Sequence, residues 1–285
     1  MEEVLSRLKE LLAELPPQLR RGAGRVLDRP RDVAVTSMRA LAASAGVTPP
    51  TMLRLARRLG FANYESFRAV FRAAVTGDGF RGKAASLQRL GEHGGDAGVV
   101  ARMGLAARDN IDATFEEAGG GDMVRAAELL RHARRIHALG VGAPHWMSCY
   151  LQYLGRAALP ELCVPPAARN SPVEEMVGVG KGDVVLILSV APYAVQMLKV
   201  AEIARAGGAS VIAVTDSRGA PLAALSDVLL VAGTASPQFY PSMVGVVAVI
   251  ETLIALAVAR GEGATLARIA AIDRLRRAEG GYIEA

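Results

Sequence analysis

The chain has 285 residues, of which 51% are hydrophobic and 21% charged, and its formal net charge is +5. This composition is ordinary for a globular chain, and the length exceeds the usual size of one hydrophobic core, so two domains are expected. Only two cysteines are present, which argues against a disulfide framework or a metal cluster, and no cofactor is expected.

The basic excess lies in the first part of the chain. Residues 1–78 contain 13 Lys and Arg against 8 Asp and Glu, whereas residues 79–285 contain 20 of each. This asymmetry is typical of a nucleic-acid-binding module joined to an electrically balanced partner domain.

Neither of two candidate segments is expected to be an export signal or a membrane span. The N-terminal stretch MEEVLSRLKELLAEL reads as a charged amphipathic helix and not as a secretory signal. The apolar stretch Met243–Gly261 is short and carries Glu251 and Thr252, which favours a buried helix at a dimer interface. A cytoplasmic protein without a membrane partner is expected.

Two short helices around a glycine are predicted early in the chain. The stretch SMRALAASAG predicts a helix that Thr36 or Ser37 caps and that ends in a tight turn at Gly46. The next helix is expected to begin at Thr48 as its N-cap, followed by Pro49 and Pro50 in the first turn, where a missing N–H costs nothing. Helix, turn and basic helix form the helix-turn-helix pattern.

The second of these helices has an apolar and a basic side. Its buried stripe is predicted to be Met52, Leu55, Ala56 and Leu59, which leaves Thr51, Arg54, Arg57 and Arg58 facing outward, and Gly60 ends the helix. Such a helix fits the DNA major groove, although a basic helix can equally be a solvated face; the charge asymmetry favours DNA. The residues expected to contact double-stranded DNA are Ser37, Thr48, Pro49, Pro50, Thr51, Arg54, Arg57 and Arg58.

The following aromatic residues indicate a core rather than a second binding surface. Phe61, Tyr64, Phe67 and Phe71 fall at helical spacing, which argues against a platform for stacking single-stranded bases. Seven glycines then lie between Thr76 and Gly98, a composition that predicts a flexible or partly helical linker. The expected domains are residues 1–76, a linker over 77–98, and residues 99–285.

Apolar strands alternate with helices after Arg134. Strands are predicted at Ile136–Gly140, Glu161–Val164, Val184–Val190, Ser210–Thr215 and Val228–Val231. Helices are predicted near Pro144–Ala158, Pro172–Val177, Ala194–Ala206, Pro221–Leu225 and Pro241–Arg260. The fold class is therefore an all-α N-terminal domain plus an α/β domain with a doubly wound, five-stranded parallel sheet, whose ligands bind at the carboxyl ends of the strands.

Two loops at that edge are the predicted ligand site. The first, GVGAPHW, begins at Gly140 and lets backbone approach a ligand at a helix start; it is not a dinucleotide fingerprint, because His145 stands where the third glycine belongs. The second, SVAPYAV, begins at Ser189 and is a strand-to-helix turn whose N–H groups suit an anion.

These segments resemble a known family. MRALAASAGVTPPTMLRLARRLGFANYESFR is similar to the helix-turn-helix of RpiR-type bacterial transcriptional regulators, and Gly182–Val231 is similar to the sugar isomerase (SIS) domain that they carry. The resemblance covers nearly all of the chain except the linker and the last two dozen residues. It implies a regulator whose SIS domain binds a sugar phosphate or related metabolite, dimerises and thereby controls DNA binding.

The ligand loops depart from the family pattern. Phosphosugar-binding SIS domains usually show S-x-S-G-x-[ST] after the third strand, where this chain keeps only Ser189, and they carry a serine in the first loop, where it has Ala143 and Pro144. Fewer hydroxyl donors weaken the case for a phosphate and favour a non-phosphorylated or differently anchored sugar derivative. The residues expected to bind the effector are Gly140, Gly142, Ala143, His145, Ser189, Ala191, Tyr193, Ala194 and Thr215, with Arg169 near enough by topology to contribute.

Two other functions stay open. A sugar phosphate isomerase on the same fold would need a general base, and only His145 lies at the site, without a carboxylate nearby in sequence. A vestigial site in a domain that only dimerises is the other alternative. The favoured interpretation is a non-enzymatic regulator that works as a homodimer or homotetramer and binds an operator and a small effector.

Overall fold

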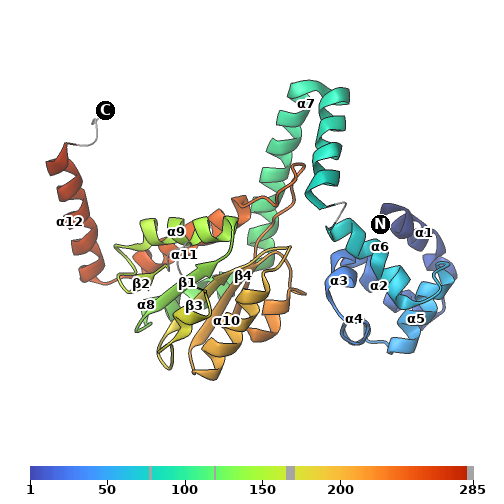
Figure 1. Ribbon diagram of the computed structural model, residues 1–285, viewed down its shortest axis with the longest axis horizontal. Coiled ribbons are helices and arrows are strands. Elements are labelled where there is room, and N and C mark those ends of the chain that lie inside the picture. Colours follow the sequence, from blue (N-terminus) through green and yellow to red (C-terminus); the bar gives the residue numbers. More distant parts are fainter. Residues whose placement is uncertain (77–78, 119, 165–170, 281–285) are drawn as a thin grey trace. The chain divides into compact units, whose positions relative to one another are not determined.

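The computed structural model describes residues 1–76, 79–118, 120–164 and 171–280. The chain divides into two compact units, Met1–Gly95 and Asp96–Ala285 (Figure 1). Each unit has buried hydrophobic clusters of its own, which agrees with two independent cores.

The first unit is helical. Its elements are α1 (Glu2–Leu11), a 3-10 turn (Leu12–Glu14), α2 (Pro17–Asp28), α3 (Pro30–Val35), α4 (Met38–Ser44), α5 (Pro49–Arg58) and α6 (Tyr64–Thr76). The aromatic residues lie in the core as predicted: Phe67 and Phe71 are fully buried with their ring centroids 4.9 Å apart, and Phe61 meets Phe67 edge-on at 5.5 Å. Edge-to-face aromatic pairs of this kind stabilise a small helical core.

The segment expected to be a linker is largely helical. Helix α7 runs over Gly79–Ala118 and is interrupted at Gly95, whose φ of 60° and ψ of −174° lie outside the helical region. Each glycine costs a helix only about 1 kcal/mol relative to alanine, and the leucines and alanines between the glycines are good helix formers. Glycine content therefore lowers helix stability here without preventing the helix.

The second unit contains a five-stranded parallel sheet. Its strands β1 (Ile136–Gly140), β2 (Leu162–Cys163), β3 (Val184–Leu188), β4 (Ser210–Thr215) and β5 (Val228–Val231) lie in the order β2-β1-β3-β4-β5. The predicted fold class is confirmed. Three of the predicted strands have the observed bounds, whereas β3 ends at Leu188 and β2 is shorter than predicted.

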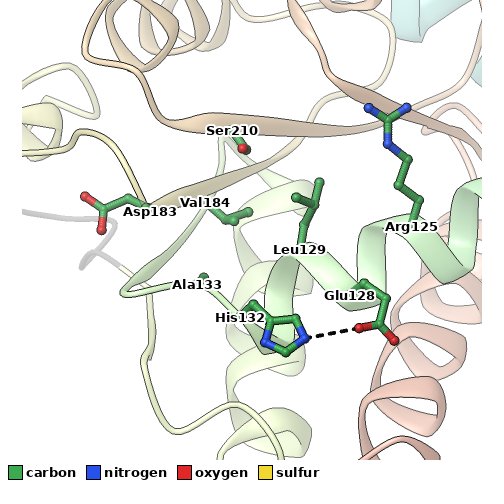
Figure 2. A pocket seen from close by; sticks show the side chains of 9 residues that line it. Arg125, Glu128, Leu129, His132, Ala133, Asp183, Val184 and Ser210 are labelled. Carbon is green, nitrogen blue, oxygen red and sulfur yellow. Dashed lines mark ion pairs between the residues drawn. The ribbon is translucent and has the colours of Figure 1, made fainter.

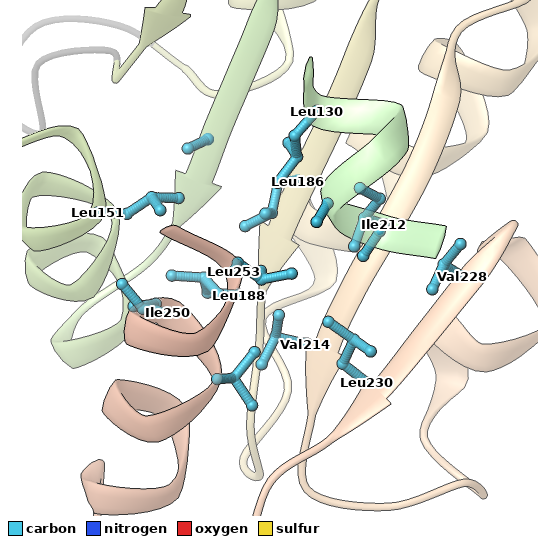
Figure 3. Close-up of a cluster of buried hydrophobic side chains, with 14 of the residues drawn as sticks. Leu130, Leu151, Leu186, Leu188, Ile212, Val214, Val228, Leu230, Ile250 and Leu253 are labelled. Carbon is cyan, nitrogen blue, oxygen red and sulfur yellow. The ribbon is translucent and has the colours of Figure 1, made fainter. Parts of the chain in front are cut away.

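Helices cover both faces of this sheet (Figure 1). Leu186 and Leu188 of β3 point to the face covered by α8 (Gly120–Arg131), α9 (Ala143–Gly155) and α11 (Val244–Ala259), as Figure 3 shows, and Val185 and Ile187 point to the face covered by α10 (Val195–Ala206). This alternation is the period of two expected for a strand buried on both sides.

The predicted helices near Pro172 and Pro221 are only 3-10 turns, Glu174–Met176 and Pro221–Leu225. The last described helix, α12, spans Gly263–Glu279. No single helix of the described residues is long and apolar enough to cross a membrane; α11 and α12 pass that test only as a pair bent by 115°.

Candidate functional site

Helices α4 and α5 form the predicted helix-turn-helix. Ser37 is the N-cap of α4, because its hydroxyl accepts a hydrogen bond of 3.1 Å from the N–H of Ala40. Gly46 adopts a φ of 61° in the turn, a conformation that glycine reaches without strain, and the N–H of Val47 bonds back to the carbonyl of Ala42. The turn predicted at Gly46 is confirmed.

Helix α5 buries the stripe predicted from its sequence and exposes the arginines. Met52, Leu55, Ala56 and Leu59 lie in the core of the first unit. Arg54, Arg57 and Arg58 are exposed, together with Thr48 and Pro50, whereas Pro49 is half-buried. Three cationic side chains are thus available on one short helix.

Thr48 is the N-cap residue of α5 and Pro49 and Pro50 occupy the first turn, as predicted, but the side chain of Thr48 makes no capping hydrogen bond, because Pro50 offers no N–H and the N–H of Thr51 bonds to the carbonyl of Thr48. One predicted detail of α5 is wrong. Thr51 does not face outward: it is only 3% exposed, because it lies one turn ahead of buried Leu55 on the same side of the helix.

The hydroxyl of Thr51 instead organises its neighbours. It lies 3.0 Å from the hydroxyl of Thr48 and accepts a hydrogen bond of 3.3 Å from a terminal guanidinium nitrogen of Arg54. The buried threonine therefore orients an exposed arginine.

Arginines of α2 brace the same motif, which sequence reasoning missed. The guanidinium of Arg21 lies directly against Gly46, where any side chain would collide with it. Arg25 donates to the hydroxyl of Ser44 at 3.1 Å and pairs with buried Asp32. The sequence holds no local signal for these contacts, since each joins two different helices or a helix and a turn, and Arg25 and Ser44 lie 19 residues apart.

The predicted effector residues gather at the carboxyl ends of the strands. The connection after β1 leads to one side of the sheet and the connection after β3 to the other, so these adjacent strands form the topological switch point. Gly140 is paired in register with Leu188, and Leu188 with Val214. The loops that follow β1, β3 and β4 therefore leave the sheet side by side.

The first of these loops is fixed by glycines. A side chain on Gly140 would meet the backbone of Pro144 at 2.6 Å, and Gly142, the N-cap residue of α9, has a φ of 71°. Ala143 begins α9, and His145 follows in its first turn with its Nε2 3.5 Å from the sulfur of Cys149. Among the described residues, His145 contacts no carboxylate.

The second loop and the end of β4 carry the other predicted residues. Ser189 is buried and its N–H donates to the carbonyl of Val214. The Ala191–Pro192 bond is cis, Tyr193 follows half-buried, and Ala194 is the N-cap residue of α10. Thr215 is fully buried and donates to Asp216 at 3.3 Å. Arg169 lies outside the described residues.

A surface hollow lies at the opposite, amino-terminal end of the strands (Figure 2). Its two carboxylates, Glu128 and Asp183, are both ion-paired. Asp183 accepts hydrogen bonds from Arg134 at 2.7 and 3.0 Å and from the N–H of Gly180 at 2.9 Å; burial acts to raise its pKa, but these donors hold the pKa below its usual value. Glu128 pairs with Arg131 at 3.2 Å and with Arg260 at 2.9 Å, and its carboxylate lies 3.3 Å from Nε2 of His132. Ion pairs therefore form part of the rim of this hollow.

Comparison with known proteins agrees with this architecture. Residues 129–259 match the SIS domain family. HexR, a helix-turn-helix transcriptional regulator of Pseudomonas aeruginosa, is 26% identical over 231 residues, which cover 81% of this chain and 79% of HexR. The bifunctional protein glk of Paraburkholderia xenovorans is 28% identical over 232 residues, which cover 80% of this chain; the match spans about a third (35%) of that longer relative.

Two solved structures share the fold. The SIS domain of an RpiR transcription factor from Sphaerobacter thermophilus covers 62% of this chain, and 98% of itself, at 22% identity and a TM-score of 0.58. The Vibrio vulnificus NanR protein, solved in complex with ManNAc-6P, covers 95% of this chain, and 97% of itself, at 18% identity and a TM-score of 0.60.

Residues 129–259, which contain the whole sheet of the second unit, thus match the SIS domain family. They follow a helical unit with a helix-turn-helix, and the resemblance drawn from the sequence is confirmed.

Proposed function

We propose that this chain is a sequence-specific DNA-binding transcriptional regulator whose SIS domain senses a sugar-related small metabolite and holds two copies together. The observation that carries the proposal is helix α5, which exposes Arg54, Arg57 and Arg58 next to a glycine turn in a unit that holds the whole basic excess of the chain. Two copies would read the half-sites of a pseudo-palindromic operator.

DNA selection tests the first half of the proposal. The full chain is incubated with a random duplex library, and the recovered sequences are compared with the input. We expect an enriched inverted repeat that binds at least about 1,000-fold more tightly than random duplex at physiological salt. Equal affinity for selected and random DNA would refute a sequence-specific regulator.

The chemistry of the effector follows from the loops at the switch point. The first loop is poor in donors for an anion: Pro144 has no N–H, and the N–H of His145 is already donated to the carbonyl of Gly142 at 3.0 Å. The second loop keeps Ser189 and the amino end of α10. A sugar derivative anchored mainly at the second loop, phosphorylated or not, is the effector class that this arrangement supports.

A thermal-shift assay of the full chain distinguishes a phosphorylated effector from an unphosphorylated one. N-acetylmannosamine 6-phosphate, the ligand of NanR, is compared with unphosphorylated N-acetylmannosamine, and other sugars and sugar acids are tested in the same paired way. A ligand at 100 times its Kd stabilises the folded chain by about 2.7 kcal/mol. If only sugar phosphates raise the midpoint of unfolding, the argument that the missing hydroxyl donors disfavour a phosphate is refuted. If no compound raises the midpoint, a domain that only dimerises is favoured.

A further inference from the structure

The second half of α7 is fastened to the segment that follows β5. Helix α7 crosses the boundary between the two units at Gly95, and its C-terminal part, Asp96–Ala118, belongs to the second unit. Two polar residues on this part are buried, Asn110 at 2% exposure and Thr114 at 0%. Buried polar side chains on a helix need partners, and both find them on the same short segment.

Asn110 pairs with a peptide group as a neighbouring strand would. Its Nδ2 donates to the carbonyl of Ala235 at 2.7 Å, and its Oδ1 accepts from the N–H of Ala235 at 2.8 Å. Thr114 donates to the carbonyl of Asn110 at 2.6 Å and accepts from the N–H of Gly233 at 2.9 Å. We call these residues, Asn110, Thr114, Gly233 and Ala235, the α7 clamp.

The packing around the clamp leaves no space for a side chain at Gly233 or at the neighbouring Gly245. A Cβ on Gly233 would lie 2.6 Å from the carbonyl oxygen of Asn110, and a Cβ on Gly245 would lie 2.6 Å from the hydroxyl of Thr114. The turn after β4 is tied to the same helix, since Arg218 donates to the carbonyl and the carboxylate of Glu117. The register between helix and segment is therefore fixed by both shape and hydrogen bonds.

The clamp lies at the carboxyl ends of the strands, where the effector loops also begin. The N–H of Ala232, next to Gly233, donates to the carbonyl of Thr215 at 2.7 Å. The preceding residue of β4, Val214, accepts the N–H of Ser189 at 3.0 Å. A chain of backbone contacts thus links the loop after β3 to the clamp.

We propose that Asn110 and Thr114 are positioning residues that couple the effector loops to α7, and through α7 to the DNA-binding unit. This inference rests on the proposed function. Coupling between two sites is reciprocal, so if effector binding alters DNA affinity, DNA binding must alter the affinity for the effector by the same factor. We expect this change to be visible as altered amide exchange in the effector loops. DNA alone can therefore test the clamp, although the effector is not identified.

The experiment follows amide hydrogen exchange in the full chain with and without its selected duplex. The reporters are peptides that cover Gly233–Ala235, whose N–H groups the clamp binds, and Ser189–Val195 in the effector loop. In the wild type, DNA is expected to change exchange at both by at least about fivefold, the lower end of typical coupling. In Thr114→Val, which keeps the shape and loses the hydroxyl, the change at Ser189–Val195 should fall below about twofold while DNA affinity without ligand is retained.

A second variant and a matched control separate coupling from simple stability. Asn110→Ala removes the other half of the clamp and should give the same loss. Thr252→Val also deletes a partly buried hydroxyl, but this one donates only to Ala248 of its own helix at 2.7 Å, so the wild-type response should persist. DNA that binds specifically yet leaves both wild-type reporters unchanged, or a full response in either clamp variant, would overturn the inference. Failure to select any duplex would refute the proposed function itself.

Discussion

Arg54 provides the sharpest test of the proposed DNA-binding surface. It is exposed on α5, and its guanidinium is held 3.3 Å from the hydroxyl of Thr51, which is buried and therefore fixed. An arginine oriented in this way loses little freedom when it binds a base edge. Arg54→Ala should cost about 1–3 kcal/mol on the selected duplex, which corresponds to a loss of about 5–150-fold in affinity.

Thr51→Val tests the orientation of the Arg54 side chain while its positive charge is kept. Valine keeps the shape that packs in the core but cannot accept the hydrogen bond from Arg54. One such hydrogen bond contributes about 0.5–1.5 kcal/mol, so the expected loss is about 2–12-fold, smaller than that of Arg54→Ala.

Fluorescence anisotropy at several salt concentrations measures both variants on selected and random duplexes. Lys9 is an exposed residue of α1 in the same unit. Lys9→Ala removes one positive charge outside the helix-turn-helix and serves as the control. A base contact predicts a loss on the selected duplex and relaxed preference at one position. Equal losses on both duplexes, with a salt slope lower by about 0.9, would show that Arg54 contacts phosphate and would refute the base-reading argument.

Two further predictions concern the second unit, each measured by chemical denaturation of the full chain. Asp183→Asn should lower the free energy of unfolding by about 1.5–3 kcal/mol at pH 7 by weakening its contacts with Arg134 and Gly180. Because the folded-state pKa of Asp183 is lowered, this stabilisation is fully present above its ordinary pKa of about 4 and is lost as the pH falls through the folded-state value, so the gap between variant and wild type should begin to narrow below about pH 4 and close below the folded-state pKa; a gap that stays constant would contradict this. Gly142→Ala should cost about 1–3 kcal/mol through backbone strain alone, since the added Cβ finds open space, and Gly104→Ala in α7 should instead stabilise by about 0.5–1 kcal/mol; equal effects would refute the strain.

The fold was predictable where hydrophobic pattern and local chemistry agree. The strands Ile136–Gly140, Ser210–Thr215 and Val228–Val231 have the predicted bounds, because a charged residue adjoins one end of each, namely Arg135, Asp216 and Asp227. The second strand was predicted too long: it lies at the edge of the sheet, so only Leu162 and Cys163 find pairing partners. An apolar run indicates burial, but pairing defines the strand.

The parts of the site that sequence missed depend on distant contacts. Asn110 and Thr114 lie more than 100 residues from Gly233 and Ala235, and no local pattern marks a helix that offers them to a loop. The apolar periodicity of α5 leaves Thr51 outside the buried stripe, whereas its partners Thr48 and Arg54 allow this polar side chain to be buried. Whether the grouped effector residues bind a ligand stays a prediction.

The distribution of charge limits how the two units can influence each other. Residues 79–285 carry 20 basic and 20 acidic side chains, and several are paired internally, such as Arg134 with Asp183 and Arg218 with Glu117. Interactions between exposed charges are largely screened beyond about 8 Å at physiological salt, so a balanced domain exerts little long-range force on DNA held by the other unit. If a ligand of the second unit controls DNA binding, as proposed, it must act mechanically, through the placement of two copies and through α7, whose two helical parts meet at Gly95 on the boundary between the units. A clamp that fixes α7 to the effector edge meets that requirement, and a helix free to slide on the sheet would not.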